Sequence, residues 1–245
     1  MSKTPARTCA VLGLVMAGLT PAAQAQIGRG WTRYSPEFDV HRQGSGQYSK
    51  SGSTEKFTIS ATGVVGKTGQ RSEIRLHNGY SSGQRQFEGY LKVVRLDGTK
   101  VSLKQTMMTG GHAFFMLSVK AEGGGQLYDH GNSGAGTFIS GVVGRTIRVN
   151  TIHDENAGTL KLYLNGSLKY TRTTPAGKTW VEKYGAYKTL SGLGPITAEW
   201  SNVNLWRSDH RHLIFCTRGG AVFAENNGIT GLRRRSSCWP RATRA

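Results

Sequence analysis

At 245 residues and a formal net charge of +18, the chain is long enough for one large domain with its own core, and two domains would be cramped. Its three cysteines are too few for a disulfide scaffold, and its 34 glycines are spread along the chain instead of forming a linker. Composition therefore favours a single globular domain and excludes a disulfide framework.

Residues 1–25 have the layout of a secretory signal peptide. Lys3 and Arg7 precede an apolar run from Cys9 to Leu19, and the small residues of a cleavage site follow at Ala23–Ala25. The apolar run is shorter than the about 20 residues of a membrane-spanning helix, and no later segment approaches that length. We therefore expect a mature chain without a membrane span that is secreted or periplasmic.

Positive charge is distributed unevenly along the chain. Residues 26–206 hold 22 basic and 12 acidic side chains, and residues 207–245 hold eight basic and two acidic ones. A secreted body this basic attracts polyanions by long-range electrostatic steering. Outside a cell these are uronate or sulfated glycans, lipopolysaccharide and stray nucleic acid. The alternative is that the charge only keeps the protein soluble.

The body of the chain, residues 26–206, reads as short strands separated by Gly, Asn, Asp and Ser. Their spacing is typical of an all-β sandwich or barrel, and no segment sustains a helical pattern for three turns. Asp97-Gly98 and Asn165-Gly166 predict type I′ hairpin turns, because both residues of such a turn have positive φ. The clearest expected strands are Lys56–Ser60, Gln86–Leu96, His112–Val119, Thr146–His153, Leu160–Leu164 and Ile196–Trp206.

The first segment suited to chemistry is Arg71–Arg75, with the sequence RSEIR. On a strand, alternate residues share a face, so Arg71, Glu73 and Arg75 point the same way. Glu73 would orient the two guanidiniums, which would present paired donors to a substrate carboxylate. The alternative is a salt-bridge ladder on a solvated face.

The second segment, Lys183–Tyr187 (KYGAY), has the same geometry. Lys183, Gly185 and Tyr187 share a face, and Gly185 leaves room for a ligand close to the backbone. Neighbouring cations would stabilise the Tyr187 phenolate and help it to act as a base. Many strands carry such a pattern for packing alone.

The chain changes character after Trp206. Residues 207–245 contain eight arginines and no lysine, together with Cys216 and Cys238. Three interpretations of this Arg-rich tail stay open: a basic arm that binds a polyanion, a subdomain closed by a disulfide, and an extension without selected structure. The abrupt change in Lys and Arg usage favours the last, so we expect the tail to lie outside the core.

Taken together, the two segments resemble, in order and spacing, polysaccharide lyase family 7, the alginate-lyase type. RSEIR matches the family pattern Arg-(Ser/Thr)-Glu-(Leu/Val)-Arg, Gln105 matches the Gln of Gln-(Ile/Val)-His, and KYGAY is similar to Lys-Ala-Gly-x-Tyr. The resemblance covers most of residues 30–206. It implies an all-β fold, a β-jelly-roll (concanavalin A-like) sandwich of two antiparallel sheets, and cleavage of a uronate-containing polysaccharide by β-elimination.

The resemblance also implies a role for each matching residue. Arg71 and Arg75 would neutralise the uronate carboxylate, assisted by Gln105, and Tyr187 would take the C5 proton and return one to the leaving oxygen. Donors aimed at the developing enolate would supply the largest share of catalysis. The expected catalytic residues are Tyr187, Gln105, Arg71 and His77, and the expected substrate-binding residues are Arg75, Lys183 and Glu73.

One departure from the family pattern concerns its histidine. Where the family has Gln-x-His, this chain has Gln105-Thr106-Met107, and a thioether cannot replace an imidazole. His77 is a candidate substitute, because it continues the face of the RSEIR segment by one more alternate position. The alternative is a solvated histidine at a strand end. The change suggests that the substrate is not ordinary alginate, with glucuronan as one possibility.

No cofactor or metal is expected, because the sequence has no cysteine pair with ligand spacing and its acidic pair Asp154-Glu155 reads as a turn, although it leaves a bound Ca²⁺ open. The expected partner is an acidic polysaccharide, bound by a monomer.

Two other hypotheses about the function stay open. One is a sandwich that binds acidic glycans without cleaving them, and the other, less favoured, is a nucleic-acid or lipopolysaccharide binder that acts through the Arg-rich tail.

Overall fold

The computed structural model describes residues 31–61, 69–188, 192, 194–208, 214–218 and 221–225. Strands dominate these residues, and helical structure within them is limited to two short 3₁₀ turns, Glu122–Gly124 and Ser133–Ala135. The predicted signal peptide lies outside the described residues.

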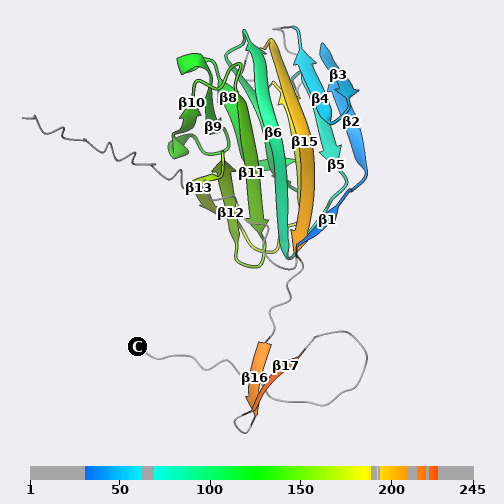
Figure 1. The fold of residues 1–245 in the computed structure, drawn as a ribbon, viewed down its shortest axis with the longest axis vertical. Helices are drawn as coiled ribbons and strands as arrows, with labels where there is room; N and C mark the ends of the chain where they lie inside the picture. Colours follow the sequence, from blue (N-terminus) through cyan, green and yellow to red (C-terminus); the bar gives the residue numbers. More distant parts are fainter. Residues whose placement is uncertain are drawn as a thin grey trace, which may run out of the picture.

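Two antiparallel sheets form the body of the protein (Figure 1). The larger, eight-stranded sheet has the order β13-β12-β11-β6-β15-β4-β3, and β1 also pairs with β15. Its strands are β1 (Thr32–Tyr34), β3 (Gly46–Ser51), β4 (Thr54–Ile59), β6 (Gln84–Leu96), β11 (Thr146–Asp154), β12 (Thr159–Leu164), β13 (Ser167–Thr173) and β15 (Ile196–Ser208).

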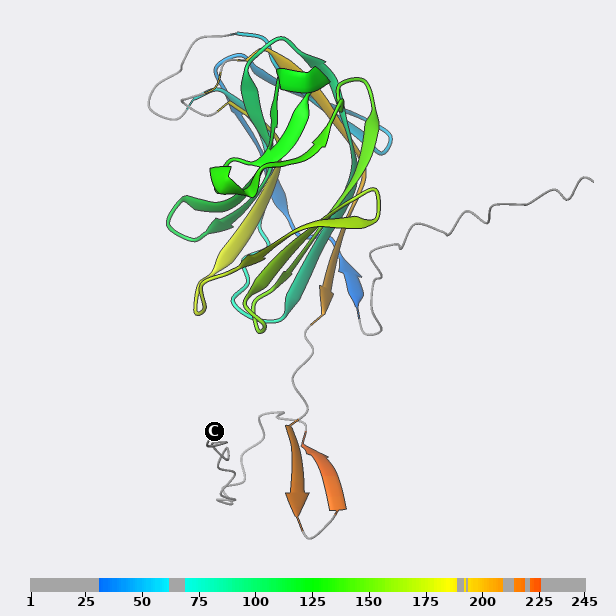
Figure 2. The same ribbon diagram turned by 90° about the vertical axis from the view of Figure 1, so that its left-hand side faces the viewer.

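The smaller, seven-stranded sheet has the order β10-β9-β8-β7-β14-β5-β2. Its strands are β2 (Phe38–Gln43), β5 (Arg71–Leu76), β7 (Lys100–Met108), β8 (His112–Lys120), β9 (Gln126–Asp129), β10 (Thr137–Ser140) and β14 (Trp180–Tyr187). Figure 2 shows the two sheets from the side, as layers that face each other. The predicted all-β sandwich of two antiparallel sheets is confirmed.

Large apolar side chains from both sheets fill the space between them. Phe87 and Trp200 of the eight-stranded sheet are fully buried and meet edge to face, with ring centroids 5.3 Å apart. Tyr184 of the seven-stranded sheet packs against the same Phe87 ring at 5.4 Å. Burying each side chain of this size contributes about 2–3 kcal/mol. This packing fixes which residues of each strand face inward.

A buried ion pair confirms the phase of β14. Lys104 Nζ lies 2.8 Å from the Glu182 carboxylate, both side chains are almost fully buried, and Lys104 also donates to the Thr106 hydroxyl. Burial lowers the pKa of Lys104, and the charge of Glu182 opposes that shift. Because Glu182 points into the interior, its neighbour Lys183 points to the outer face of the sheet.

The two predicted hairpin turns have different outcomes. Asn165-Gly166 is a hairpin turn, with φ of 50° and 82°, and it joins β12 to β13. The hairpin prediction at Asp97-Gly98 is wrong, because β6 before it and β7 after it belong to different sheets. The backbone amides of Asp97 and Gly98 instead donate to the Pro195 carbonyl, at 3.1 and 3.0 Å. This turn carries the chain from one sheet to the other.

Within the Arg-rich tail the structure describes two strands, β16 (Ile214–Arg218) and β17 (Ala221–Glu225). They pair with each other in a two-stranded sheet of their own. The sequence did not predict this hairpin. Cys238 lies outside the described residues, so a disulfide with Cys216 stays a prediction, as do the boundary at residue 207 and the exclusion of the tail from the core.

Candidate functional site

Strand register joins the two segments that the sequence singled out. β5 lies between β2 and β14, and β14 lies between β5 and β7. Inward-facing Ile74 is fully buried in the core, so the alternate residues of β5 face outward. Residues opposite each other on the outer face are Arg71 and Tyr187, Glu73 and Gly185, Arg75 and Lys183, and Lys183 and Gln105.

We call this region, made of Arg71, Glu73, Arg75, Gln105, Lys183 and Tyr187 together with His41 of β2, the basic face. Glu73 lies at its centre and is 1% exposed. Gln105 Nε2 donates to Glu73 Oε1, and Arg71 Nη1 lies 3.5 Å from Oε2. The carboxylate that was expected to orient the arginines is therefore bound by one of them and by Gln105.

Burial shifts the pKa values of the two charged side chains at the centre of the basic face, Glu73 and Lys183. Burial raises the pKa of Glu73 to about 7, and Lys183, Arg71 and the Gln105 hydrogen bond oppose that rise. Burial also lowers the pKa of Lys183, which Glu73 counteracts. The balance between burial and cations leaves Glu73 close to half-ionised at neutral pH. The net charge of the basic face therefore depends on pH near neutrality.

Tyr187 is held by a cation. The Arg71 guanidinium carbon lies 4.5 Å from the centroid of the Tyr187 ring, within cation–π range. Arg71 thus touches both Glu73 and Tyr187 and links the two predicted segments. Tyr187 is half-buried and Arg75 is exposed, whereas Arg71, Gln105 and Lys183 are each less than 10% exposed. Of these five side chains, Tyr187 and Arg75 are therefore the most accessible to solvent.

Gly185 allows β5 and β14 to lie close together. Its φ is 135°, and a Cβ added there would lie 2.5 Å from the Ser72 carbonyl oxygen and 2.8 Å from the Glu73 Cα. The space that the sequence assigned to a ligand is therefore occupied by the neighbouring strand. Gly185 serves the site by bringing Glu73 next to β14.

His77 lies two residues beyond Arg75 and away from Glu73, Gln105 and Tyr187. It follows the last residue of β5, and its Nε2 lies 2.8 Å from Asp39 Oδ2 in an exposed pair. Six residues separate it from Arg71 along an extended chain, roughly 20 Å. Its role as a catalytic group stays a prediction that the geometry does not favour.

The structure places a different histidine, His41, on the basic face. His41 of β2 lies directly opposite Glu73 on the side away from β14, and it is exposed. Its pKa is lowered by partial desolvation of the ring and by the charges of Arg71 and Lys183. Sequence reasoning missed it because no strand was assigned to residues 38–43. The register with β5 was the missing information.

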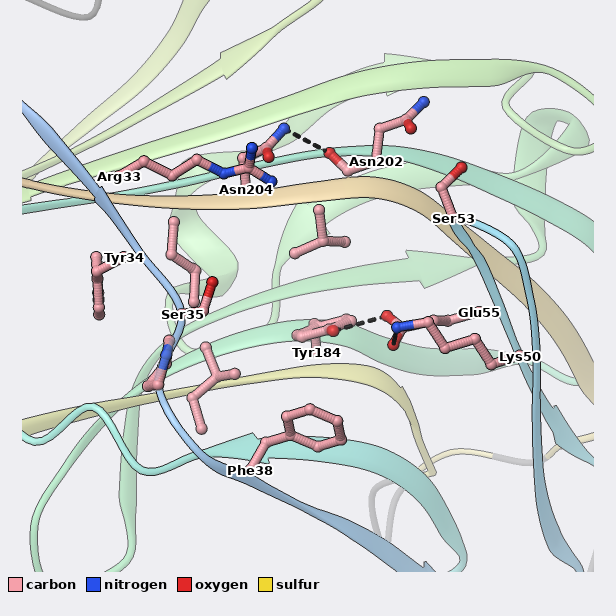
Figure 3. Close-up of a pocket in the computed structure, with 14 residues that line it drawn as sticks. Arg33, Tyr34, Ser35, Phe38, Lys50, Ser53, Glu55, Tyr184, Asn202 and Asn204 are labelled. Atoms are coloured by element: carbon pink, nitrogen blue, oxygen red, sulfur yellow. Dashed lines mark hydrogen bonds and ion pairs between the residues drawn. The ribbon is translucent and has the colours of Figure 1, made fainter.

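A cavity lies on the opposite side of β14 from the basic face (Figure 3). It measures about 500 Å³, and its lining includes Asn202–Asn204, where β15 passes from its pairing with β4 to its pairing with β1. On its floor the Tyr184 hydroxyl donates to Glu55 at 2.7 Å, and Lys50 reaches the same carboxylate at 3.4 Å. Because Tyr184 points inward and Lys183 outward, this cavity is separate from the basic face.

Among the residues that the structure describes, no group of three His, Cys, Asp or Glu side chains is placed to hold a metal ion. The same residues include no helix that is long and apolar enough to cross a membrane.

Several solved structures with a similar architecture are alginate lyases. One of polysaccharide lyase family 7 has a TM-score of 0.54 at 18% identity and covers 73% of this chain and 94% of its own. The alginate lyase of Corynebacterium sp. gives 0.53 at 16%, covering 71% and 82%, and that of Pseudomonas aeruginosa gives 0.52 at 16%, covering 64% and 84%. At such identities the likeness shows the fold, the β-jelly-roll sandwich that the sequence resemblance implied.

Sequence comparison is less informative. No family model matches the chain. A citrate-binding protein of Hevea brasiliensis is 27% identical over 150 residues, which are 60% of this chain and 60% of that protein. The chain therefore spans less than two thirds of that relative's length.

Proposed function

We propose that the basic face binds an acidic, uronate-containing polysaccharide and cleaves it by β-elimination. The observation that carries the proposal is the convergence of Arg71, Gln105 and Tyr187 around the buried Glu73 through the register of three strands. Each segment alone fits a salt-bridge ladder or a packing pattern. Their contact on one face, in a fold shared with alginate lyases, favours the chemistry.

The cations of the basic face would lower the barrier to removal of the C5 proton, which is the difficult step of the reaction. The C5 proton of a uronate is weakly acidic, because its removal adds a second negative charge next to the carboxylate. Arg71, Arg75 and Lys183 would offset that charge as the enolate forms. The C4–O4 bond then breaks, a C4–C5 double bond forms, and the leaving oxygen takes up a proton. The bond is broken without water.

We assign the proton transfer to Tyr187, and we assign His41 as the imidazole that stands in for the histidine replaced by Met107. The lowered pKa of His41 keeps its ring neutral near pH 7, so it can accept a proton. His41 lies two strands away from β14, in line with Gly185, and Tyr187 is two residues beyond Gly185 along β14. The backbone positions of His41 and Tyr187 are therefore roughly 12 Å apart. A sugar lying over Arg71 can contact both side chains.

The test follows the ultraviolet absorbance of the new double bond when purified protein meets alginate, polymannuronate, polyguluronate or glucuronan. We expect absorbance on at least one polymer, its loss in Tyr187→Phe, and a fall of tenfold or more in His41→Gln. His77→Gln is the matched control, because His77 is an exposed histidine paired with Asp39 at the strand end. A folded protein that gives no absorbance on any of the four polymers contradicts cleavage.

The similarity to a citrate-binding protein favours a second candidate function, in which the same cations bind a carboxylate-rich ligand without cleaving it. Calorimetric titration with citrate and with polyuronates distinguishes the two. Binding that is lost in Arg71→Ala, together with no ultraviolet signal, supports the binder. A protein that cleaves a uronan and ignores citrate supports the lyase.

We also propose that the protein is secreted or periplasmic and acts as a monomer, in line with the predicted signal peptide and an extracellular polymer as substrate. A nucleic-acid or lipopolysaccharide partner would act through the Arg-rich tail. Deleting residues 209–245 separates the hypotheses, since the lyase proposal expects activity to survive and the tail hypothesis expects polyanion binding to be lost.

A further inference from the structure

A basic pocket lies on the outer side of the seven-stranded sheet, toward β10. It measures about 560 Å³. Lys100 of β7 and Lys120 of β8 lie directly opposite each other in its wall, and Tyr128 of β9 stands beside them. The remaining lining residues are Thr99, Glu122, Gly136 and Thr137. Nothing in the proposed reaction uses this pocket.

Strand register connects this pocket to the basic face in a straight row. Tyr187 lies opposite Ser102, which lies opposite Ser118, which lies opposite Tyr128. Tyr128 alternates with Leu127 and Asp129, which are fully buried, so its ring is on the outer side of the sheet. Three strand spacings separate Tyr128 from Tyr187, roughly 14 Å. The row continues the basic face across the sheet.

The charges of the pocket are incompletely matched. Two lysines directly opposite each other on a sheet repel, and the cost is offset only by nearby anions. Lys120 Nζ lies 2.9 Å from a carboxylate oxygen of Glu122, which is exposed. Among the residues that the structure describes, no carboxylate forms an ion pair with Lys100. The pair of lysines and one carboxylate leave a net positive charge that suits an anionic ligand.

Tyr128 supplies a rigid flat surface beside these charges. Its hydroxyl lies 3.2 Å from His130 Nδ1, and Lys120 Nζ lies 5.9 Å from the ring centroid. Lys100 also acts on His130, because burial and the Lys100 charge both lower the pKa of that ring. An aromatic ring held next to two ammonium groups can pack against a sugar ring while the lysines bind its carboxylate.

We propose that Lys100, Lys120 and Tyr128 form a distal subsite for a uronate unit of the same polysaccharide chain, more than one sugar away from the bond that breaks. The proposal rests on the proposed function, because it assumes that the polymer lies across the strands over the basic face. It assigns to this pocket the recognition of chain length. Short oligomers over Tyr187 do not reach the pocket, and long ones do.

The experiment titrates uronate trimers and octamers into Tyr187→Phe protein, which holds substrate without turnover, by calorimetry. We expect the added change Lys100→Ala with Lys120→Ala to weaken octamer binding about tenfold and to leave trimer binding unchanged. Lys161→Ala with Lys169→Ala, on β12 and β13 of the other sheet, is the matched control for lost charge and should change neither.

Two outcomes contradict the proposed distal subsite. In one, the lysine double variant binds the trimer and the octamer equally weakly, and in the other it binds both as tightly as before. The proposed function fails separately if the protein with Tyr187 intact cleaves no uronan while the length-dependent loss of binding is still observed. In a cleaving protein the same double variant should lower kcat/KM about tenfold for the octamer alone. Circular dichroism checks that the variants, changed only at partly exposed residues, remain folded.

Discussion

Replacing Glu73 by glutamine isolates the buried carboxyl at the centre of the basic face. Burial raises its pKa from 4.5 to about 7, so between these values the folded protein keeps a proton that the unfolded chain has released. The folded state binds more protons than the unfolded state in this window, and the free energy of unfolding therefore falls as pH rises through it. The amide of the Glu73→Gln variant cannot ionise, so the variant lacks this contribution.

The size of the effect follows from the pKa difference. One unit corresponds to about 1.4 kcal/mol, so the shift from 4.5 to about 7 gives about 3 kcal/mol. No correction for solvent screening is needed, because the side chain is almost fully buried. Measured against the wild type, Glu73→Gln should gain about 3 kcal/mol of stability between about pH 4 and about pH 8.

Urea unfolding across this pH range, followed by the fluorescence of buried Trp200 and Trp180, measures the difference. Met107→Leu is the control, since it changes a side chain near Gln105 without adding or removing an ionisable group. Its stability should run parallel to that of the wild type. If the curves of wild type and Glu73→Gln are also parallel, the carboxyl is not held near pKa 7 and the electrostatic account of the face is wrong.

Three further predictions concern neighbouring features. Tyr184→Phe removes the hydroxyl that donates to buried Glu55 and should cost about 1–3 kcal/mol in urea unfolding while trimer binding is retained. Gly185→Ala introduces a Cβ 2.5 Å from the Ser72 carbonyl at φ 135°, so it should destabilise by more than about 1 kcal/mol and reduce lyase activity. Polyuronate affinity should fall as salt rises, and less steeply in Arg75→Ala, as measured by titration in increasing sodium chloride.

The fold could be predicted from the sequence because strand alternation and turn residues are local signals. Asn165-Gly166 specified its hairpin correctly, since the positive φ values belong to those two residues themselves. Asp97-Gly98 has a similar composition and failed. Its flanking strands join different sheets, and its two backbone amides donate to the carbonyl of the distant Pro195 instead of closing a hairpin. The residue types of a turn do not predict a hydrogen bond to a residue so far away in the sequence.

The part of the candidate site that lies on a single strand was predictable, because the alternation of side chains is also a local signal. The outward phase of Arg71, Glu73 and Arg75 follows from alternation, and the structure agrees. From the sequence alone, further residues of that face could be sought only along the same strand, and the next alternate position after Arg75 is His77. The register of β2 places His41 across the strand instead, next to Glu73. Neighbours across a sheet are set by pairing between distant segments, so they require the fold.

Binding a carboxylate and cleaving a uronate polymer make different demands on the basic face. Holding a carboxylate needs only cations, and Arg75 and Lys183 would serve a citrate-like ligand as well as a polymer. Cleavage also needs a group that takes the C5 proton while the same cations offset the charge. Arg71 links the two demands, because it contacts both Glu73 and the Tyr187 ring. Binding a carboxylate does not by itself require that link, so its presence supports the proposed lyase function.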